Sequence, residues 1–258
     1  MESDNKIYAL SIAGFDPSAG AGILADIKTF ESIGVYGLGI CSAITYQNDI
    51  SFERVDWIKK EQIREQFYVL SKRFKIEFIK IGLVESPDTL IYILDFLKTG
   101  NNEIKIIWDP ILKASAGFDF HPLFDEKNME AIYKQLYLIT PNREEIKRLV
   151  PHFDEIEGAR HIGKSCSVLL KGGHAEGEKL VDILFTNNRE SNYYADRIPN
   201  GAKHGSGCVL SSAITGYLAQ RKEINEACKK GKEYIHEFLS SSETLLGIHY
   251  KEKTIHAD

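Results

Sequence analysis

Short apolar runs alternate along the chain with segments in which apolar positions recur at helical spacing. The runs predict buried strands at residues 7–14, 37–46, 78–84, 104–111, 138–142 and 167–173. Helical spacing predicts helices at residues 23–30, 61–74, 86–100, 129–137, 143–150 and 155–165. Repeated strand–helix units of this kind predict an α/β fold, with a mainly parallel sheet and helices on both faces.

The last third of the chain breaks this alternation. Residues 179–186 and 191–198 have β-like composition and predict a hairpin that turns near residues 187–189. Two helices follow, at residues 209–221 and 224–239. The first should carry an apolar stripe, formed by Val209, Leu210, Ala213, Ile214, Tyr217 and Leu218. Since no repeat, low-complexity tract or linker interrupts the pattern, we expect one domain over residues 1–258.

Composition narrows the classes of function. The chain has 258 residues, 43% of them hydrophobic, and a net charge of −5, which argues against a broad basic surface for nucleic acid. Neither a secretory signal nor an apolar run long enough to span a bilayer is found, so no membrane partner is expected. The four cysteines are far apart and lack metal-type spacing, which favours a cytoplasmic chain with reduced thiols.

The stretch HGSGC, which begins at His204, joins a glycine corner to a helix. The helix would direct its first N–H groups toward Gly205, Ser206 and Gly207, where an anion such as a phosphoryl group would be stabilised. A tight turn is the alternative for such a corner. Cys208 is either a small buried hydrophobe or, because a helix N-terminus favours thiolate, a reactive group.

A second corner, FDPSAGAG at residues 15–22, follows the first strand. Ligands of open α/β sheets bind outside the carboxyl ends of strands, which is where this corner lies. It matches neither GxGxxG nor the Walker pattern, so nicotinamide-binding and P-loop functions have little support. Asp16 suits an Asx turn. Asp26, one turn into the next helix, is either a surface carboxylate or a group that faces the pocket.

Polar side chains also follow later strands. Asp109 is suited to organising metal-bound water or to beginning a turn. Asn142 and Glu145 have the spacing of a capping box, and the same pair would help to hold Mg²⁺ near phosphates through water. Lys171 is either a phosphate ligand or a solvated lysine at a strand end.

Together these stretches resemble a known family. SIAGFDPSAGAG, SAITYQN, IKIGLV, WDPIL, TPNREE, LLKGGH and HGSGCVLSSAI occur in the order seen in hydroxymethylpyrimidine/phosphomethylpyrimidine kinases of the ribokinase-like superfamily. The resemblance implies a three-layer α/β/α sandwich. It also implies an ATP- and Mg²⁺-dependent kinase of thiamine biosynthesis, which phosphorylates 4-amino-5-hydroxymethyl-2-methylpyrimidine and then its monophosphate.

The same resemblance assigns a substrate pocket. Gln47 corresponds to the family glutamine that hydrogen-bonds the pyrimidine edge, Asp26 to an acidic residue that contacts substrate, and Gly14 to a glycine of the pocket wall. Leu83 stands where methionine is common in the bifunctional kinases. This departure bears on how the pocket receives ring substituents or the monophosphate.

The remaining matched positions concern phosphate. Lys171 resembles the lysine that meets ATP phosphate and developing charge, and Asp109, Asn142 and Glu145 resemble the polar set around metal and phosphates. Residues 205–208 resemble the anion-hole loop, and the resemblance implies that they act in catalysis. Relatives in the wider superfamily commonly have aspartate as the base at the last of these positions, whereas this family has cysteine.

Two alternatives stay open. A pyridoxine/pyridoxal kinase would use the same fold on another ring that carries a hydroxymethyl group. A sugar kinase is disfavoured because GSGC lacks the aspartate at the base position. A non-catalytic pyrimidine- or nucleotide-binding protein is the alternative of a different class.

The family resemblance also leads us to expect a homodimer.

Overall fold

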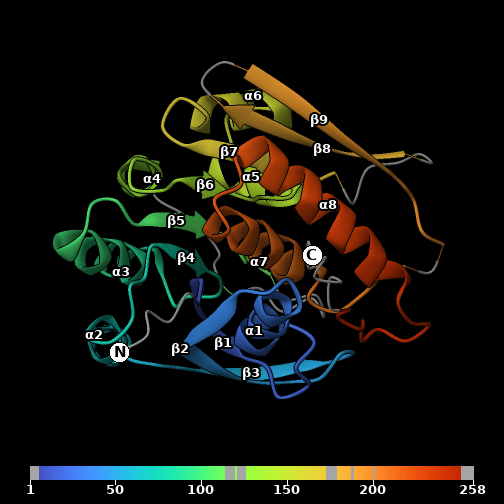
Figure 1. Ribbon diagram of the computed structural model, residues 1–258. Coiled ribbons are helices and arrows are strands. Elements are labelled where there is room, and N and C mark those ends of the chain that lie inside the picture. Colours follow the sequence, from blue (N-terminus) through green and yellow to red (C-terminus); the bar gives the residue numbers. More distant parts are fainter. Residues whose placement is uncertain are drawn as a thin grey trace, which may run out of the picture.

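The strands form one continuous sheet. The computed structural model describes residues 6–113, 120, 126–172, 179–186, 189–199 and 201–250. Its strands are β1 (Tyr8–Phe15), β2 (Tyr36–Gln47), β3 (Phe52–Trp57), β4 (Phe78–Ile81), β5 (Lys105–Trp108), β6 (Leu138–Ile139), β7 (Ser167–Leu170), β8 (Lys179–Thr186) and β9 (Arg189–Asp196). They lie in the order β3-β2-β1-β4-β5-β6-β7-β8-β9 (Figure 1).

The middle of the sheet is parallel and its margins are antiparallel. Each pairing from β2 through β1 and β4 to β7 is parallel, while β3, β8 and β9 pair in the antiparallel sense. The chain runs from β1 to β2 on one side and then to β4 on the other. The sheet therefore reverses its winding direction at β1, which is where open α/β sheets bind ligands.

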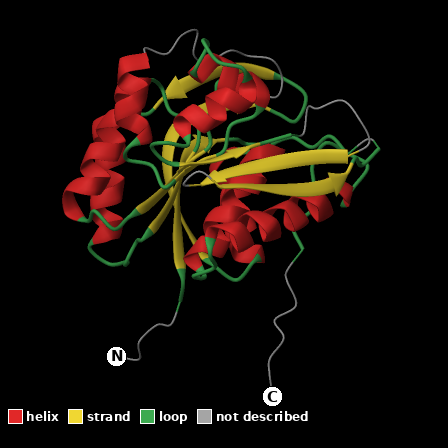
Figure 2. Cartoon of the chain, turned by 90° about the horizontal axis from the view of Figure 1, so that it is seen from above, coloured by secondary structure: helices red, strands yellow, loops and turns green. Residues whose placement is uncertain are grey.

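Helices cover both faces of the sheet (Figure 2). They are α1 (Gly22–Ser32), α2 (Lys60–Ser71), α3 (Pro87–Gly100), α4 (Glu126–Tyr133), α5 (Arg143–Leu149), α6 (Glu155–Ile162), α7 (Ser206–Ala219) and α8 (Ile224–Ser240). Helices α1, α7 and α8 share one buried apolar cluster, and α2 to α6 contribute to a second on the opposite face. The predicted mainly parallel sheet between helical layers is confirmed.

Most predicted elements are found at nearly the expected positions. Ser86 caps α3, since its hydroxyl accepts a hydrogen bond from the Thr89 N–H at 3.1 Å, and Pro87 is the first helical residue. The hairpin of β8 and β9 is also confirmed, although residues 187 and 188 of its turn lie outside the described part of the chain. Gly173, predicted as the end of a strand, also lies outside it.

Strand β3 was missed by the sequence prediction. Its residues FERVDW do not alternate strictly in polarity, since Glu53 and Arg54 are adjacent, and none of them is fully buried because the strand lies at the edge of the sheet. A turn at Asn48 connects it to β2, with the Asn48 side chain accepting from the N–H groups of Ile50 and Ser51. A short edge strand needs little apolar surface, so its sequence signal is weak.

Helix α7 is buried on all sides, whereas the sequence predicted an apolar stripe on one face. Every residue from Cys208 to Ala219 is buried, including Ser211, Ser212 and Thr215. The helix is enclosed by the sheet, by α1 and by α8, as the orange ribbon in Figure 1 shows. A helix buried on all sides has no polar face, and its hydroxyl groups must find partners inside the protein.

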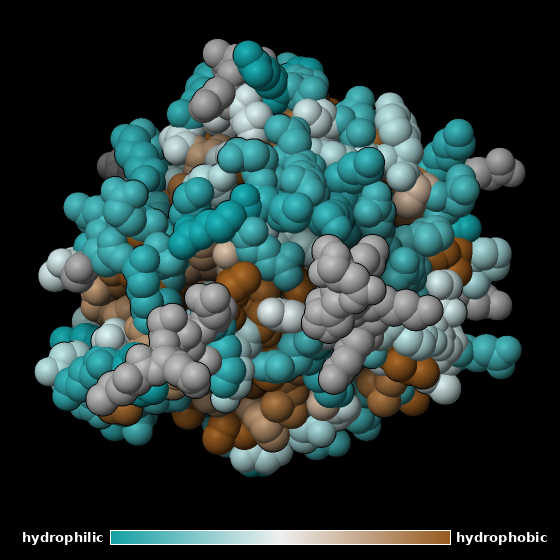
Figure 3. Space-filling model, in the orientation of Figure 1, coloured by the Kyte–Doolittle hydropathy of each residue, from teal (hydrophilic) through white to brown (hydrophobic). Residues whose placement is uncertain are grey.

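The surface is mainly polar on the face drawn in Figure 3, where apolar side chains gather in the lower half of the view. None of the helices in the described part of the chain is long and apolar enough to cross a bilayer.

Replacement of Ile214 tests the burial of α7. Ile214 is fully buried and packs against Gly231 of α8, so Ile214→Ala should lower the free energy of unfolding by about 2–5 kcal/mol. Val69 of α2 is 65% exposed, and Val69→Ala should change it by no more than about 0.5 kcal/mol. Urea unfolding measures both, and equal effects would contradict the enclosed position of α7.

Candidate active site

The glycine corner at the start of α7 has the geometry of an anion hole. Gly205 caps the helix with φ of +74°, which favours glycine, and a Cβ there would collide with the carbonyl oxygen of Gly20. Neither a side-chain cap nor an acidic residue occupies the first turn. The Ser206 N–H donates to the Lys203 carbonyl oxygen at 3.4 Å, so the next N–H groups, those of Gly207 and Cys208, are the ones available to a negative group. Their role toward phosphate stays a prediction.

The first corner packs directly beneath this helix start. Asp16 is fully buried and accepts hydrogen bonds from the N–H groups of Ser18 at 2.9 Å and Ala21 at 2.8 Å. Its predicted Asx turn is confirmed. Gly22 has φ of +61°, and a Cβ there would collide with the carbonyl oxygen of Gly14. Together with the contact of Gly205 on Gly20, this leaves no room for a Cβ at Gly22 or at Gly205.

His204 joins the two corners and was missed as a site residue. Its Nε2 lies 2.8 Å from Asp16 Oδ2, and both side chains are almost completely buried. Burial raises the pKa of the Asp16 carboxyl, but hydrogen bonds from His204, Ser18 and Ala21 hold it below its usual value. Because the partners are 188 residues apart in sequence, the only local signal was a histidine next to the glycine corner.

Lys171 and Asp109 form a buried ion pair beside the hole. The Lys171 ammonium lies 2.8 Å from Asp109 Oδ1 and 3.7 Å from Glu145 Oε2. A Cβ on Gly207 would be 3.5 Å from that ammonium. Burial opposes the charge of Lys171, but Asp109 and Glu145 raise its pKa above the usual value, so the ammonium stays protonated next to the hole.

The carboxyl groups of this cluster differ in ionisation. Burial raises the pKa of Asp109, but Lys171 and Lys80 outweigh it and hold that pKa below its usual value. Burial is the main cause that raises the pKa of Glu145 to about 7, with a contribution from Asp109. One acid is therefore a fixed anion, whereas the other titrates near neutral pH.

Asn142 and Glu145 form the capping box that their spacing indicated. Asn142 Oδ1 accepts from the Glu145 N–H at 2.8 Å, and Glu145 Oε2 accepts from the Asn142 N–H at 2.7 Å. Among the described residues, no three His, Cys, Asp or Glu side chains gather closely enough to hold a metal ion by themselves. A role of Asp109, Asn142 and Glu145 toward Mg²⁺ remains a prediction.

One large cavity brings most of the predicted residues together. It has a volume of about 690 Å³. Its lining includes these predicted site residues: Gly14, Gln47, Leu83, Asp109, Asn142, Glu145, Lys171, Gly205, Ser206, Gly207 and Cys208. They come from the carboxyl ends of the parallel strands and from the start of α7. The size is in the range of small-molecule sites.

Gly14, Gln47 and Leu83 lie at one end of this cavity. Gly14 lies against Leu83, since a Cβ on Gly14 would be 3.3 Å from the leucine side chain. Gln47 is held nearby, because its Nε2 donates to Thr45 Oγ1 at 2.8 Å. Phe52 and Phe120 line the same cavity with their ring centroids 5.2 Å apart. This end therefore combines apolar contacts with one amide.

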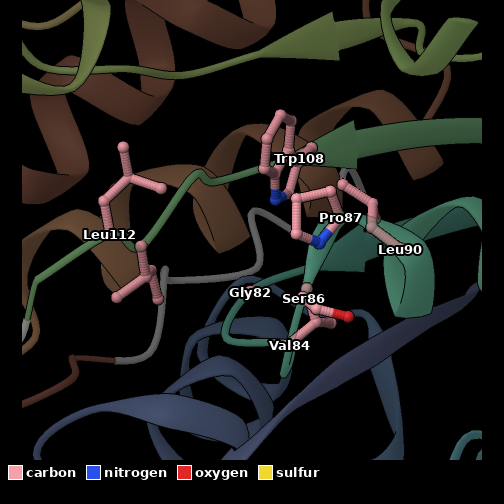
Figure 4. Close-up of a pocket in the computed structure, with 8 residues that line it drawn as sticks. Gly82, Val84, Ser86, Pro87, Leu90, Trp108 and Leu112 are labelled. Carbon is pink, nitrogen blue, oxygen red and sulfur yellow. The ribbon is translucent and has the colours of Figure 1, made fainter. Parts of the chain in front are cut away.

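A much smaller cavity lies behind the ends of β4 and β5. Figure 4 shows Trp108, Leu112, Pro87 and Leu90 among the side chains around it. Its volume of about 10 Å³ has room for no more than a water molecule. The large cavity is thus the candidate for substrate binding.

Asp26 does not line the large cavity, so the expectation that it faces the pocket is wrong for this structure. Its side chain is fully buried, and the Lys80 ammonium lies 2.8 Å from Oδ2. Ser11 donates to Oδ2 at 2.5 Å and Ser212 donates to Oδ1 at 2.7 Å. With both oxygens bonded to groups of the protein, Asp26 connects α1 to β1, β4 and α7.

Cys208 lies at the predicted position, but its acidity differs from the expectation. The thiol is buried in the first turn of α7, and burial is the main cause that raises its pKa to about 11. Lys80 opposes this effect without overcoming it. The helix N-terminus therefore does not make Cys208 a thiolate at neutral pH in this structure.

An uncapped helix start beside a protonated lysine, at the carboxyl edge of a parallel sheet, defines a protein built to bind and stabilise phosphoryl groups. The model of the phosphomethylpyrimidine kinase family matches residues 16–252. The chain therefore belongs to this family.

Individual relatives agree with this assignment. A hydroxymethylpyrimidine/phosphomethylpyrimidine kinase of Aquifex aeolicus is 32% identical over 253 residues, covering 93% of this chain and 96% of that protein. The crystal structure of phosphomethylpyrimidine kinase from Clostridium difficile has a TM-score of 0.76 and 35% identity, covering 90% and 99%. The ADP complex of Bacillus subtilis pyridoxal kinase has a TM-score of 0.82 and 25% identity, covering 96% and 98%. The ribokinase-like fold is confirmed.

Titration of Glu145 gives a test of its buried surroundings. Because its pKa is raised from 4.5 to about 7, the folded protein binds this proton more tightly than the unfolded chain does. Its contribution to stability is complete below about pH 4.5 and is lost as the pH rises to about 7. Glu145→Gln keeps an oxygen for the capping box and should flatten this decrease in urea unfolding. An unchanged pH dependence would contradict the buried, titrating carboxyl.

Proposed function

We propose that this protein is an ATP-dependent kinase that phosphorylates the hydroxymethyl group of 4-amino-5-hydroxymethyl-2-methylpyrimidine, and then its monophosphate, in thiamine biosynthesis. The observation that carries the proposal is the shared cavity, in which the anion hole at Gly205–Cys208 and the Lys171 ammonium face the same space as Gln47. Family membership and the kinases among its relatives support it.

Each end of the cavity has a proposed ligand. The Gln47 amide would bind the polar edge of the pyrimidine, with Gly14 and Leu83 against the ring. The nucleotide phosphates would lie toward Asn142, Glu145 and Lys171. Mg²⁺ would be held chiefly by phosphate oxygens and water, with Glu145 and Asp109 nearby, because Asp109 is already bonded to Lys171. When bound, the ion would neutralise part of the phosphate charge.

The transfer itself relies on positioning and electrostatics. The alcohol oxygen attacks the γ-phosphorus of ATP while the bond to the β-phosphate oxygen breaks. The N–H groups of the first turn of α7 and the Lys171 ammonium stabilise the charge on the transferring group. We assign the alcohol proton to the Cys208 sulfur, which acts as base when it is deprotonated.

A pyridoxal kinase is the second candidate. The specific observation in its favour is the backbone likeness to the Bacillus subtilis enzyme, whose TM-score of 0.82 exceeds the 0.76 of the phosphomethylpyrimidine kinase structure. The latter has the higher sequence identity, 35% against 25%. Since side chains rather than the backbone select the ring, we favour the aminopyrimidine.

A substrate panel tests the proposed function. The chain should consume ATP only when an alcohol is added, and it should convert the aminopyrimidine to its monophosphate and diphosphate. Pyridoxine and ribose are assayed in parallel, and products are identified by mass spectrometry. No phosphorylated pyrimidine at saturating Mg-ATP would reject the proposal, and efficient phosphorylation of pyridoxine alone would establish the second candidate.

Replacement of Cys208 tests its assignment as base. In the second step the nucleophile is a phosphate oxygen that needs little help from a base, so Cys208→Ala should slow the first phosphorylation more than the second. Because the thiol has a pKa of about 11, kcat of the first step should rise with pH between about 7 and 9 in the wild type and not in the variant. Equal losses in both steps, with the fold and substrate affinity intact, would contradict the assignment.

A further inference from the structure

The start of α7 is held in place without a side-chain cap. A helix is commonly fixed at its N-terminus by a side chain that caps the first N–H groups. Helix α7 has no such side-chain cap. A cap would occupy the donors that the proposed anion hole needs. Something else must therefore determine where these donors point.

Ser212 provides one attachment, a turn beyond the hole. Its hydroxyl donates to Asp26 Oδ1 at 2.7 Å. Asp26 is bound in turn by the Lys80 ammonium of β4 and by the Ser11 hydroxyl of β1. All four side chains are fully buried. The second turn of α7 is thus bonded to Asp26 of α1, which is itself paired with Lys80 of β4.

Ser211 provides a second attachment in a different direction. Its oxygen lies 3.2 Å from Asp109 Oδ2, whose carboxylate pairs with Lys171 at the cavity wall. It also lies 3.0 Å from the carbonyl oxygen of Gly207 and 3.1 Å from that of Cys208. The single hydroxyl proton is therefore shared among a carboxylate of the site and two carbonyls of the first turn.

Adjacent residues of a helix point about 100° apart around its axis. Two adjacent hydroxyls bonded to two different carboxylates therefore oppose both rotation and sliding of α7. We propose that Ser211 and Ser212 are positioning residues for phosphoryl transfer, which hold the uncapped first turn of α7 on the buried pairs Asp109–Lys171 and Asp26–Lys80. This inference rests on the proposed function, since it assigns the first turn to the transferring phosphoryl group.

Thr215 supplies the matched control. It is fully buried in the same helix, one turn further on, but its hydroxyl donates to the carbonyl oxygen of Ser211 at 2.8 Å within the helix itself. Thr215→Val removes a buried hydroxyl of nearly equal size without touching either carboxylate. A loss of activity that follows only from destabilising α7 should appear in this variant too.

The experiment compares Ser212→Ala, Ser211→Ala and Thr215→Val in the full chain. The serine variants should lower kcat by about ten- to hundredfold with little change in KM for the alcohol, because misplaced donors weaken the transition state more than substrate binding. Thr215→Val should retain kcat near the wild-type value. Thermal unfolding of each variant shows whether the comparison is made between folded proteins.

A serine variant that is no slower than Thr215→Val would overturn the proposal, and so would a loss confined to KM. The wild type is assayed on the aminopyrimidine and on pyridoxal, and the variant ratios are taken on whichever alcohol is phosphorylated. If neither is, the proposed function fails. In that case calorimetry measures the affinity of each protein for Mg-ADP with fluoroaluminate. Equal affinities in the wild type and both serine variants would overturn the positioning role of the serines.

Discussion

The start of α7 is under two opposing requirements. In the proposed function, the N–H groups of Gly207 and Cys208 must stay unpaired to receive a phosphoryl group, yet they must be held in one place within a cavity of about 690 Å³. Contact between backbones meets part of the second requirement. Gly205 and Gly20 approach so closely that no side chain fits between them, and the pair of His204 with Asp16 holds the two corners together. Glycines at positions 20 and 205 are therefore needed to bring the two corners together, and not only to form each turn.

We assign the rest of the work of holding the start of α7 in place to two buried ion pairs. The pair of Lys80 with Asp26 lies beneath the hole, and the pair of Lys171 with Asp109 lies beside it. Removing such charges from water is costly, and their mutual attraction seldom repays more than the cost. Their value is therefore in geometry, because each carboxylate accepts bonds from several elements at fixed angles. Of these two pairs, only Lys171 and Asp109 line the large cavity, so only their charges are placed to contact a ligand there.

The sequence allowed the alternation of strands and helices to be predicted, because buried parallel strands leave a strong apolar signal. It also indicated most cavity residues, because they follow the ends of those strands. Prediction from the sequence failed where a strand is exposed or where a charged side chain is buried. Strand β3 is too exposed to leave a clear signal, while Asp26 is a carboxylate that the fold buries completely. The partner of Asp26, Lys80, is an internal charge within an apolar strand, and no local pattern shows which distant group neutralises it.

Cys208 shows how the surroundings decide between two roles of one residue. Its backbone N–H belongs to the first turn of an uncapped helix, and the proposed contact of this N–H with a phosphoryl group does not depend on the side chain. Its sulfur is enclosed, and burial raises the thiol pKa to about 11, so that only a small fraction is thiolate near neutral pH. The nearby Lys80 ammonium lowers that pKa, while Asp26 and Asp109 raise it. A bound phosphate would add further negative charge, which opposes ionisation of the thiol unless a cation accompanies it. The proposed role of the sulfur as a base therefore requires that bound ligands balance the charges of the site, whereas the proposed role of the backbone N–H does not.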